Sequence, residues 1–344
     1  MTPSTPALPS APRGRAATPM AFVHSITRAY ELRGMNPASA LQTARIAPQD
    51  VTDPQARVTA AQFEALNAHA MQELDDEALG WFTRRLPWGS HGMLCRASIT
   101  APNLGVAIKR WCRHHRLLTE DIGLALCVEG GQASVTITEH RDLGEFREFG
   151  LVSCLRFLHG YACWAIDSRI PLQGAQFPFA PPPHASAYPL MFTGALQFGA
   201  RAARYTFDEQ YLGLPLQRDE RALRGMLQRA LPLTVRQYRR DRLLGQRVRE
   251  LLHAHLGSAH TAEALAALLH LSSRTLHRQL HEEGLSLQAL KDEVRQAQAM
   301  DELRRSQRPI KQVALAVGFR NEKSFTRAFR EWTGTTPGAF RQGK

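Results

Sequence analysis

The last third of the chain holds one short pattern twice, and this repeat constrains the fold more than any other feature of the sequence. In each copy an apolar stripe leads into a two-residue turn, and a polar residue then opens a second apolar stripe. The first copy begins near Leu265, and the second repeats it from Val313, with an offset of 48 residues before the turn and 49 after it. Apolar stripes at helical spacing around a tight turn predict two helix-turn-helix units, at about 262–282 and 310–332.

The residues around each turn agree with this interpretation. Ser272 and Asn321 can cap the second helix of their unit, because their side-chain oxygens accept hydrogen bonds from free first-turn amides. Gly318 supplies the positive φ that a tight turn needs. His270 takes the matching place in the first unit, and histidine adopts positive φ more readily than most residues. We therefore expect a slightly strained first turn that keeps the motif.

Positive charge gathers at this end of the chain. Residues 234–344 hold 20 Lys and Arg against 11 Asp and Glu, a net charge of +9, whereas the rest of the chain supplies only +3 of the total +12. Each predicted second helix also has a basic outer face. A single basic face is common on solvent-exposed helices of any helical protein. Two basic faces at matching positions of the two repeats predict a module that binds a polyanion.

A long ordered motif in this region resembles the AraC/XylS family of transcription regulators. It runs through Arg295-x3-Ala299-x3-Leu303, Pro309-Ile310, Val313-Ala314, Val317-Gly318-Phe319, Phe325-Thr326-Arg327-Ala328-Phe329, Trp332-x-Gly334 and Thr336-Pro337-x3-Arg341. The upstream part, from about Phe22 to Leu216, resembles the arabinose-binding-like effector domain of one branch of that family. His270 departs from the pattern, because the family usually has glycine there.

The resemblance implies a sequence-specific regulator of transcription that is not an enzyme and carries no cofactor. It implies double-stranded promoter or operator DNA, a small-molecule effector and RNA polymerase as partners, with a homodimer as a further expectation. It favours an activator, although the sequence leaves repression open. The implied DNA-binding residues are Ser273, Arg274, His277, Arg278, Glu322, Lys323, Ser324, Thr326, Arg327 and Arg330.

The expected fold is an α+β effector-binding domain followed by an all-α domain, in which a linker helix joins the two helix-turn-helix units. Residues 20–216 form the first domain, residues 242–344 the second, and the Arg-rich segment 217–241 the linker. The first 19 residues, mostly Pro, Ala, Ser and Thr, are expected to be a disordered tail, and Met20 is an alternative start.

The linker helix is expected from about Leu287 to Arg305. This stretch has no Gly or Pro, and Ser286 can cap it. The spacing of Leu287, Leu290, Val294 and Ala297 predicts one apolar stripe along its length, which Met300 and Leu303 extend.

The N-terminal part mixes helical and strand patterns. Helices are expected over most of 21–85, with one ending at 77–82 and with Asp75, Asp76 and Glu77 pointing outward. Alternating apolar residues around Gly130-Gly131 predict a β-hairpin. The long apolar stretch 149–166 predicts a buried helix, and three shorter segments after it predict strands.

Candidates for effector binding in this part are Trp81, Arg85, Trp111 and Trp164, although aromatic residues at such spacing are more often core. The sequence has no Gly-rich phosphate loop, HExxH or GxSxG motif. Two alternatives stay open: an enzyme that a DNA-binding tail localises, and a body that is a protein-interaction or dimerisation module without a ligand.

The five cysteines form no CxxC pair, so reduced thiols are expected and a metal site is not. No apolar stretch approaches the roughly 18 residues of a membrane span. The expected location is therefore the cytoplasm.

Overall fold

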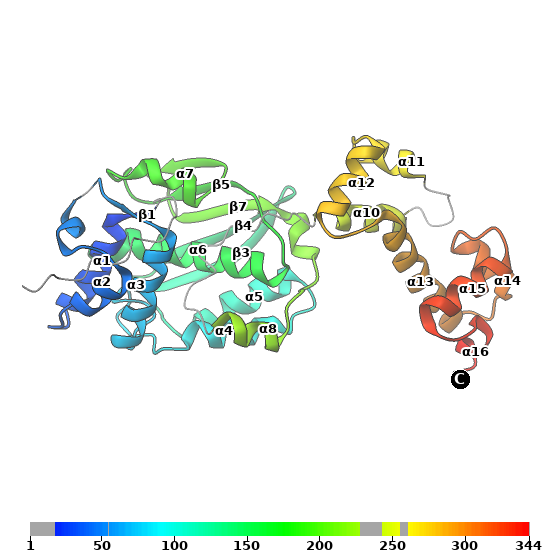
Figure 1. Ribbon diagram of the computed structural model, residues 1–344, viewed down its shortest axis with the longest axis horizontal. Coiled ribbons are helices and arrows are strands. Elements are labelled where there is room, and N and C mark those ends of the chain that lie inside the picture. The colour runs from blue at the N-terminus through cyan, green and yellow to red at the C-terminus, as the bar shows by residue number, and fades with distance from the viewer. Residues whose placement is uncertain (1–17, 54, 228–242, 255–260, 344) are drawn as a thin grey trace, which may run out of the picture. The chain divides into compact units, whose positions relative to one another are not determined.

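The computed structural model describes residues 18–53, 55–227, 243–254 and 261–343 (Figure 1). The chain divides into two compact units, Met1–Arg239 and Arg240–Lys344. Most of the expected disordered tail and residues 228–241 of the expected linker lie outside the described residues. The last two tail residues are ordered, because strand β1 (Thr18–Pro19) pairs with β2 (Arg57–Val58).

Helices open the first unit, as the sequence predicts. The helix α3 begins with a capping box, in which Thr59 accepts from the Gln62 amide and the Gln62 side chain accepts from the Thr59 amide. Its neighbour α5 is capped by Asn103, whose side chain accepts from Val106 at 2.9 Å. The helices before the sheet are α1 (Met20–Glu31), α2 (Ala38–Ala44), α3 (Ala60–Glu73), α4 (Ser90–Ile99) and α5 (Leu104–His115).

The helix expected to end at 77–82 does not exist, because α3 stops at Glu73 and the chain turns. Asp76, expected to point outward, is 1% exposed. Its carboxylate accepts hydrogen bonds from the amides of Ala78, Gly80 and Leu86 and pairs with Arg33 at 2.5 Å. Buried amides of an irregular loop need acceptors, so Asp76 serves the loop that follows α3.

The neighbouring Glu77 is also buried, at 5% exposure. It accepts from the amides of Gly89 and His91 at 2.7 Å each and contacts His91 Nδ1 at 2.6 Å. Burial alone would raise the pKa of Glu77, but the interactions with His91 and the amides outweigh it and hold the pKa below its ordinary value.

A five-stranded sheet in the order β3-β4-β7-β5-β6 forms the other half of this unit. The β3–β4 hairpin confirms the predicted turn at Gly130-Gly131, with Glu129 opposite Gln132. All neighbouring strands are antiparallel except the pair β5–β6. The strands are β3 (Ile122–Glu129), β4 (Gln132–Glu139), β5 (Leu172–Phe177), β6 (Ala195–Phe198) and β7 (Ala203–Asp208).

One face of the sheet is buried under helices. Alternate residues of β4 and β7 point into the core, among them Val135 and Tyr205, while Thr136 and Arg204 lie on the other face. Helix α6 (Arg147–Ala165) contacts these two strands, and α5 contacts β3. The buried α6 confirms the helix predicted from the apolar stretch 149–166.

The start of the expected linker is part of the first unit. Gln217 donates its amide to Ala165 at 2.7 Å, and α8 (Glu220–Leu227) packs against α4. Leu223 of α8 is fully buried, and Glu220 pairs with Arg96 at 3.2 Å. An apolar side on a short helix gains stability only by burial, and α4 provides the surface for it.

The second unit is all-helical, as predicted. Its helices are α10 (Leu243–Ala254), α11 (Ala262–Leu268), α12 (Ser273–Glu282), α13 (Leu287–Arg305), α14 (Ile310–Ala316), α15 (Glu322–Thr333) and α16 (Pro337–Arg341). Gly257, which the sequence suggests as the end of the helix that begins at Leu243, lies outside the described residues.

Two further expectations concern the cysteines as metal ligands and the helices as membrane spans. All five cysteines are free thiols. No group of three or more potential metal ligands occurs within the described ranges. Across these same ranges, no helix combines the length and the apolar character that crossing a membrane requires.

A buried histidine makes the stability of the first unit depend on pH. His115 on α5 is 3% exposed, and its burial, followed by the charge of His91, lowers its pKa to about 4. The unfolded chain takes up a proton at a pKa of about 6.5. The histidine's contribution to stability is therefore complete above pH 6.5 and is lost as the pH falls towards 4.

We expect the free energy of unfolding to fall from pH 7.5 to pH 5 by about 2 kcal/mol less in His115→Leu than in the parent. Urea titrations followed by tryptophan fluorescence at the two pH values measure this difference. The exposed His24 provides the control, and His24→Leu should keep the parental pH dependence. Equal losses in the parent and in His115→Leu would contradict the prediction.

Candidate nucleic-acid interface

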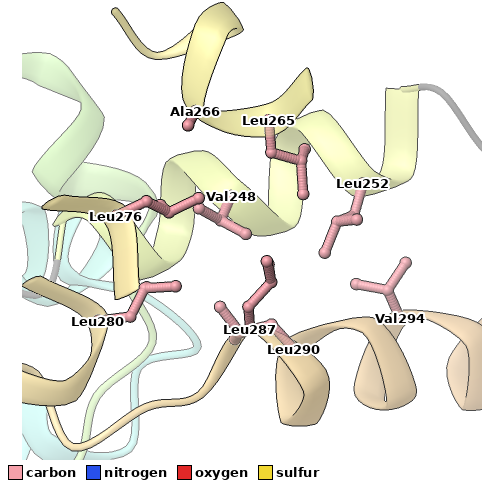
Figure 2. Packing of buried hydrophobic residues seen from close by; sticks show 9 residues of the cluster. All are labelled: Val248, Leu252, Leu265, Ala266, Leu276, Leu280, Leu287, Leu290 and Val294. Carbon is pink, nitrogen blue, oxygen red and sulfur yellow. The ribbon is translucent and has the colours of Figure 1, made fainter. Parts of the chain in front are cut away.

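The first helix-turn-helix packs its helices around one apolar cluster (Figure 2). The second helix of the motif, α12, contributes Leu276 and Leu280, both fully buried. Helix α10 packs on the same cluster, and so does the start of α13. The nine buried members are Val248, Leu252, Leu265, Ala266, Leu276, Leu280, Leu287, Leu290 and Val294.

The second helix-turn-helix has its own cluster, which is richer in aromatic residues. Phe325 and Phe329 of α15 are fully buried in it, with ring centroids 5.6 Å apart. Trp332 and Phe340 pack against them from α15 and α16. The seven buried members are Ala299, Leu303, Val313, Ala314, Val317, Phe325 and Phe329.

The caps and turns of both units confirm the predictions. Ser272 Oγ accepts from the Thr275 amide at 3.1 Å, and Asn321 Oδ1 accepts from the Ser324 amide at 2.8 Å. His270 has φ of 55° and Gly318 has φ of 83°. The histidine therefore occupies the left-handed conformation that glycine adopts without strain, and the first turn keeps the motif geometry.

A buried carboxylate that the sequence does not reveal fastens α10 to the first helix-turn-helix. Glu283, at the end of α12, is 5% exposed and accepts from the Gly245 amide at 3.0 Å. A Cβ on Gly245 would lie 2.4 Å from Leu285 Cδ1 and 2.9 Å from Glu283 Oε2, so a larger residue would push both side chains away. A negative charge near a helix N-terminus is also favourable. The sequence feature that could have indicated this contact is a glycine inside a predicted helix together with an acidic residue in a predicted turn.

The helix α13 confirms the predicted linker helix, including its cap, since Ser286 Oγ accepts from the Ala289 amide at 3.1 Å. The predicted single stripe is wrong: Ala297 is exposed and Ala299 is buried instead. At 100° per residue, the residues that α13 gives to the first cluster and those that it gives to the second point roughly 170° apart. The two helix-turn-helix motifs thus pack on nearly opposite faces of α13.

The exposed face of α15 forms an open groove of about 770 Å³, together with the N-terminal cap of α16. Five of the six residues expected there line the groove, and three of these are cationic. The sixth, Ser324, does not line it and is half-buried. The groove is lined by Glu322, Lys323, Thr326, Arg327, Arg330, Glu331 and Thr336.

Two of these lining residues escaped the sequence analysis. Glu331 follows Arg327 by four residues, so helical spacing alone places it on the same face. Thr336 comes after α15 has ended at Gly334, whose φ of 76° turns the chain back. Its position beside α15 therefore depends on the packing of α16 and could not be read from spacing.

The matching face of α12 is also exposed. Arg274, His277 and Arg278 are exposed, while Ser273 is half-buried at the start of the helix. Partial burial, and then the charge of Arg295, lower the pKa of Lys291 on the adjoining α13. The exposed faces of α12 and α15 are thus predominantly basic, and each backs onto its own apolar cluster.

The candidates for effector binding do not form one site. Trp81 packs edge-on against Phe149, with centroids 5.2 Å apart, and Arg85 is exposed. Trp111 and Trp164 lie together on either side of Tyr161, at 4.7 and 6.1 Å. All three tryptophans are under 9% exposed, so they are part of the core.

Comparison with known proteins agrees with this arrangement. The family described as "Arabinose-binding domain of AraC transcription regulator, N-term" matches residues 34–216, and a family described as "Helix-turn-helix domain" matches 265–343. The "Ornithine utilization regulator" of Pseudomonas aeruginosa is 29% identical over 327 residues, which are 94% of this chain and 96% of that protein.

Two further similarities are confined to the C-terminal part. The "HTH-type transcriptional activator RhaS" of Escherichia fergusonii is 36% identical over 94 residues, 27% of this chain and 34% of that protein. The solved structure of the DNA-binding domain of AdpA with a target DNA is 31% identical, with a TM-score of 0.27, over 29% of this chain and 90% of that chain. The arabinose-binding match alone spans more than half of the sequence, and the chain belongs to the AraC family of DNA-binding transcription regulators.

Proposed function

We propose that this regulator reads two half-sites on one face of DNA, with α12 and α15 in successive major grooves about 34 Å apart. The observation that supports this most is α13. One uninterrupted helix takes part in both apolar clusters, so it sets the distance and the angle between the two exposed basic faces. A stiff connection suits simultaneous reading of two grooves.

The roles proposed for single residues follow from side-chain chemistry. Arg274 and Arg278 on α12 and Arg327 on α15 read guanine O6 and N7, because a guanidinium matches that pair of acceptors. Arg330 and Arg341 bind phosphates, which fixes register without reading sequence. The remaining proposed contacts to bases or phosphates come from Ser273, His277, Glu322, Lys323, Ser324 and Thr326.

We propose residues 20–216, extended by 217–227, as an effector-binding domain and residues 242–344 as the DNA-binding domain. Among the effector candidates, we place most weight on Trp111 and Trp164. Tyr161 packs against both rings, and its buried hydroxyl interacts with that of Ser98 without a hydrogen bond of good geometry. Buried hydroxyls that are bonded only weakly are costly, and a polar ligand would satisfy them.

The relatives suggest which effector and which outcome to test first. The full-length relative is named for ornithine utilization, so an amino acid of this type is the first effector to examine. The partial relative is named an activator, which favours activation through contact with RNA polymerase in the cytoplasm. The competing proposal is that the N-terminal unit serves dimerisation or protein interaction and binds no small molecule.

The first test concerns the residues that read bases. We expect Arg278→Ala and Arg327→Ala each to weaken operator binding by roughly 1–3 kcal/mol and to relax base preference at a few positions. Arg330→Ala should weaken all sequences about equally. Selection on random DNA, followed by titration, measures both effects. If all three variants returned the parental motif, the assigned readers would be wrong.

The second test concerns α13 as the spacer. One Ala inserted after Gln298 falls between the residues of the first cluster and those of the second. The insertion would turn one helix-turn-helix relative to the other by about 100° and shift it by about 1.5 Å. Operator binding should fall towards the non-specific level, while salt-dependent binding to random DNA persists. A folded insertion variant that still discriminates its operator like the parent would show that the units are flexibly joined.

The third test concerns the effector. Ornithine at 100 times its dissociation constant should stabilise the chain by about 2.7 kcal/mol, which raises the melting temperature of the first unit by roughly 5–10 °C. Tyr161→Phe should reduce this shift, and Lys109→Ala, at an exposed position of α5, serves as the control from the same unit. If neither ornithine nor related amino acids changed the melting temperature, the interaction-module alternative would be favoured.

A further inference from the structure

Two arginines of α13 stack on aromatic rings of the second helix-turn-helix. The guanidinium carbon of Arg295 lies 5.2 Å from the ring centroid of Phe319, and that of Arg304 lies 5.4 Å from the ring centroid of Phe340. Both distances are within the range of a cation–π interaction. The two arginines are nine residues apart, so they lie about 13.5 Å apart along the helix axis.

The two rings belong to segments that hold α15 from both ends. Phe319 is in the turn before α15 and packs on Phe325 and Trp332, with centroids 5.6 and 5.9 Å away. Phe340 is in α16, after α15, and packs edge-on against Phe329 at 5.4 Å. Each arginine therefore contacts an aromatic ring that packs against the buried side of α15. The opposite side of α15 lines the groove.

The arginines lie on opposite sides of the buried strip that α13 presents to this unit. The strip consists of Ala299 and Leu303. At 100° per residue, Arg295 lies about 60° from the centre of the strip on one side, and Arg304 about 120° on the other. Apolar burial is non-directional, so the strip by itself permits the unit to roll around α13. A roll in either sense moves one ring away from its guanidinium.

The first helix-turn-helix is fixed on α13 in another way. Its cluster includes the additional helix α10, which contacts α13 along its side and pairs with it through Arg249 and Glu293 at 3.0 Å. Glu283 fastens the start of α10 to the turn after α12. The second helix-turn-helix has the short α16 in place of α10. Its rotation about α13 therefore depends more on the two stacked arginines.

We propose that Arg295 and Arg304 are positioning residues, which fix the rotation of the second helix-turn-helix about α13 and so decide which half-site spacing the protein accepts. The proposal rests on the proposed reading of two half-sites, because only then does a preferred spacing exist. Neither arginine needs to touch DNA for this role.

The experiment uses the full chain and an operator obtained by selection on random DNA. Affinity is measured on duplexes whose half-sites keep the selected spacing or are moved by one base pair in either direction. Arg295→Met and Arg304→Met keep the apolar stem and remove the planar cation. Each variant should reduce the preference for the selected spacing about two- to fivefold, and the double variant should reduce it further.

The control is Arg305→Met, on the same helix and with the same change of charge. The Arg305 side chain is 80% exposed and pairs with Asp301, so this variant should keep the parental spacing preference. Phe319→Leu removes a ring instead of a cation and should broaden the spacing preference by itself. In that background Arg295→Met should have no further effect on spacing.

The outcomes separate the two levels of the proposal. A parent protein that binds its selected DNA without any spacing preference would contradict the reading of two half-sites, and the positioning role with it. A parent with a clear preference that the folded double variant retains would overturn the positioning role alone. The positioning role would also be overturned if Arg295→Met changed the spacing preference equally in the presence and in the absence of the Phe319 ring. A general loss of affinity at every spacing, with unchanged ratios, would likewise assign the arginines to stability only.

Discussion

The architecture of the second unit depends on the burial of one helix, α13, in two separate apolar clusters. Short helices such as α11 and α14, with seven residues each, are not stable by themselves in water. They persist because each packs into a cluster to which one half of α13 contributes, and the two halves present nearly opposite faces. The same burial therefore stabilises both helix-turn-helix units and fixes how their exposed basic faces are related in space.

Buried carboxylates complete this structure where regular secondary structure ends. In the first unit, Asp76 accepts amides of the loop after α3, and Glu77 accepts amides at the start of α4. In the second unit, Glu283 accepts the Gly245 amide of α10. A carboxylate has several acceptor positions and can satisfy more than one amide at once. Each of these acidic residues is thus a fastening point between segments, although its charge would suggest a solvated surface position.

The two units divide the work of a transcription regulator along the chain. The first buries its tryptophans in a core of helices on a sheet, and leaves a few hydroxyl groups in that core without partners. The second leaves its cationic side chains exposed and keeps aromatic and aliphatic residues behind them. The second unit thus presents an exposed basic surface that is supported from behind by packed apolar clusters, which suits DNA binding.

The sequence by itself determined the features that depend on near neighbours. The caps at Ser272, Asn321 and Ser286, the positive φ of His270 and the bounds of α13 all follow from residues within one or two turns, and all were predicted. The tertiary structure decided which side of α13 is buried beyond Val294, because the position of a second packing partner is not encoded in local spacing. It also decided the burial of Asp76, Glu77 and Glu283, the docking of α8 and the presence of Thr336 beside α15. Each of these depends on packing between separate segments, which local spacing does not encode.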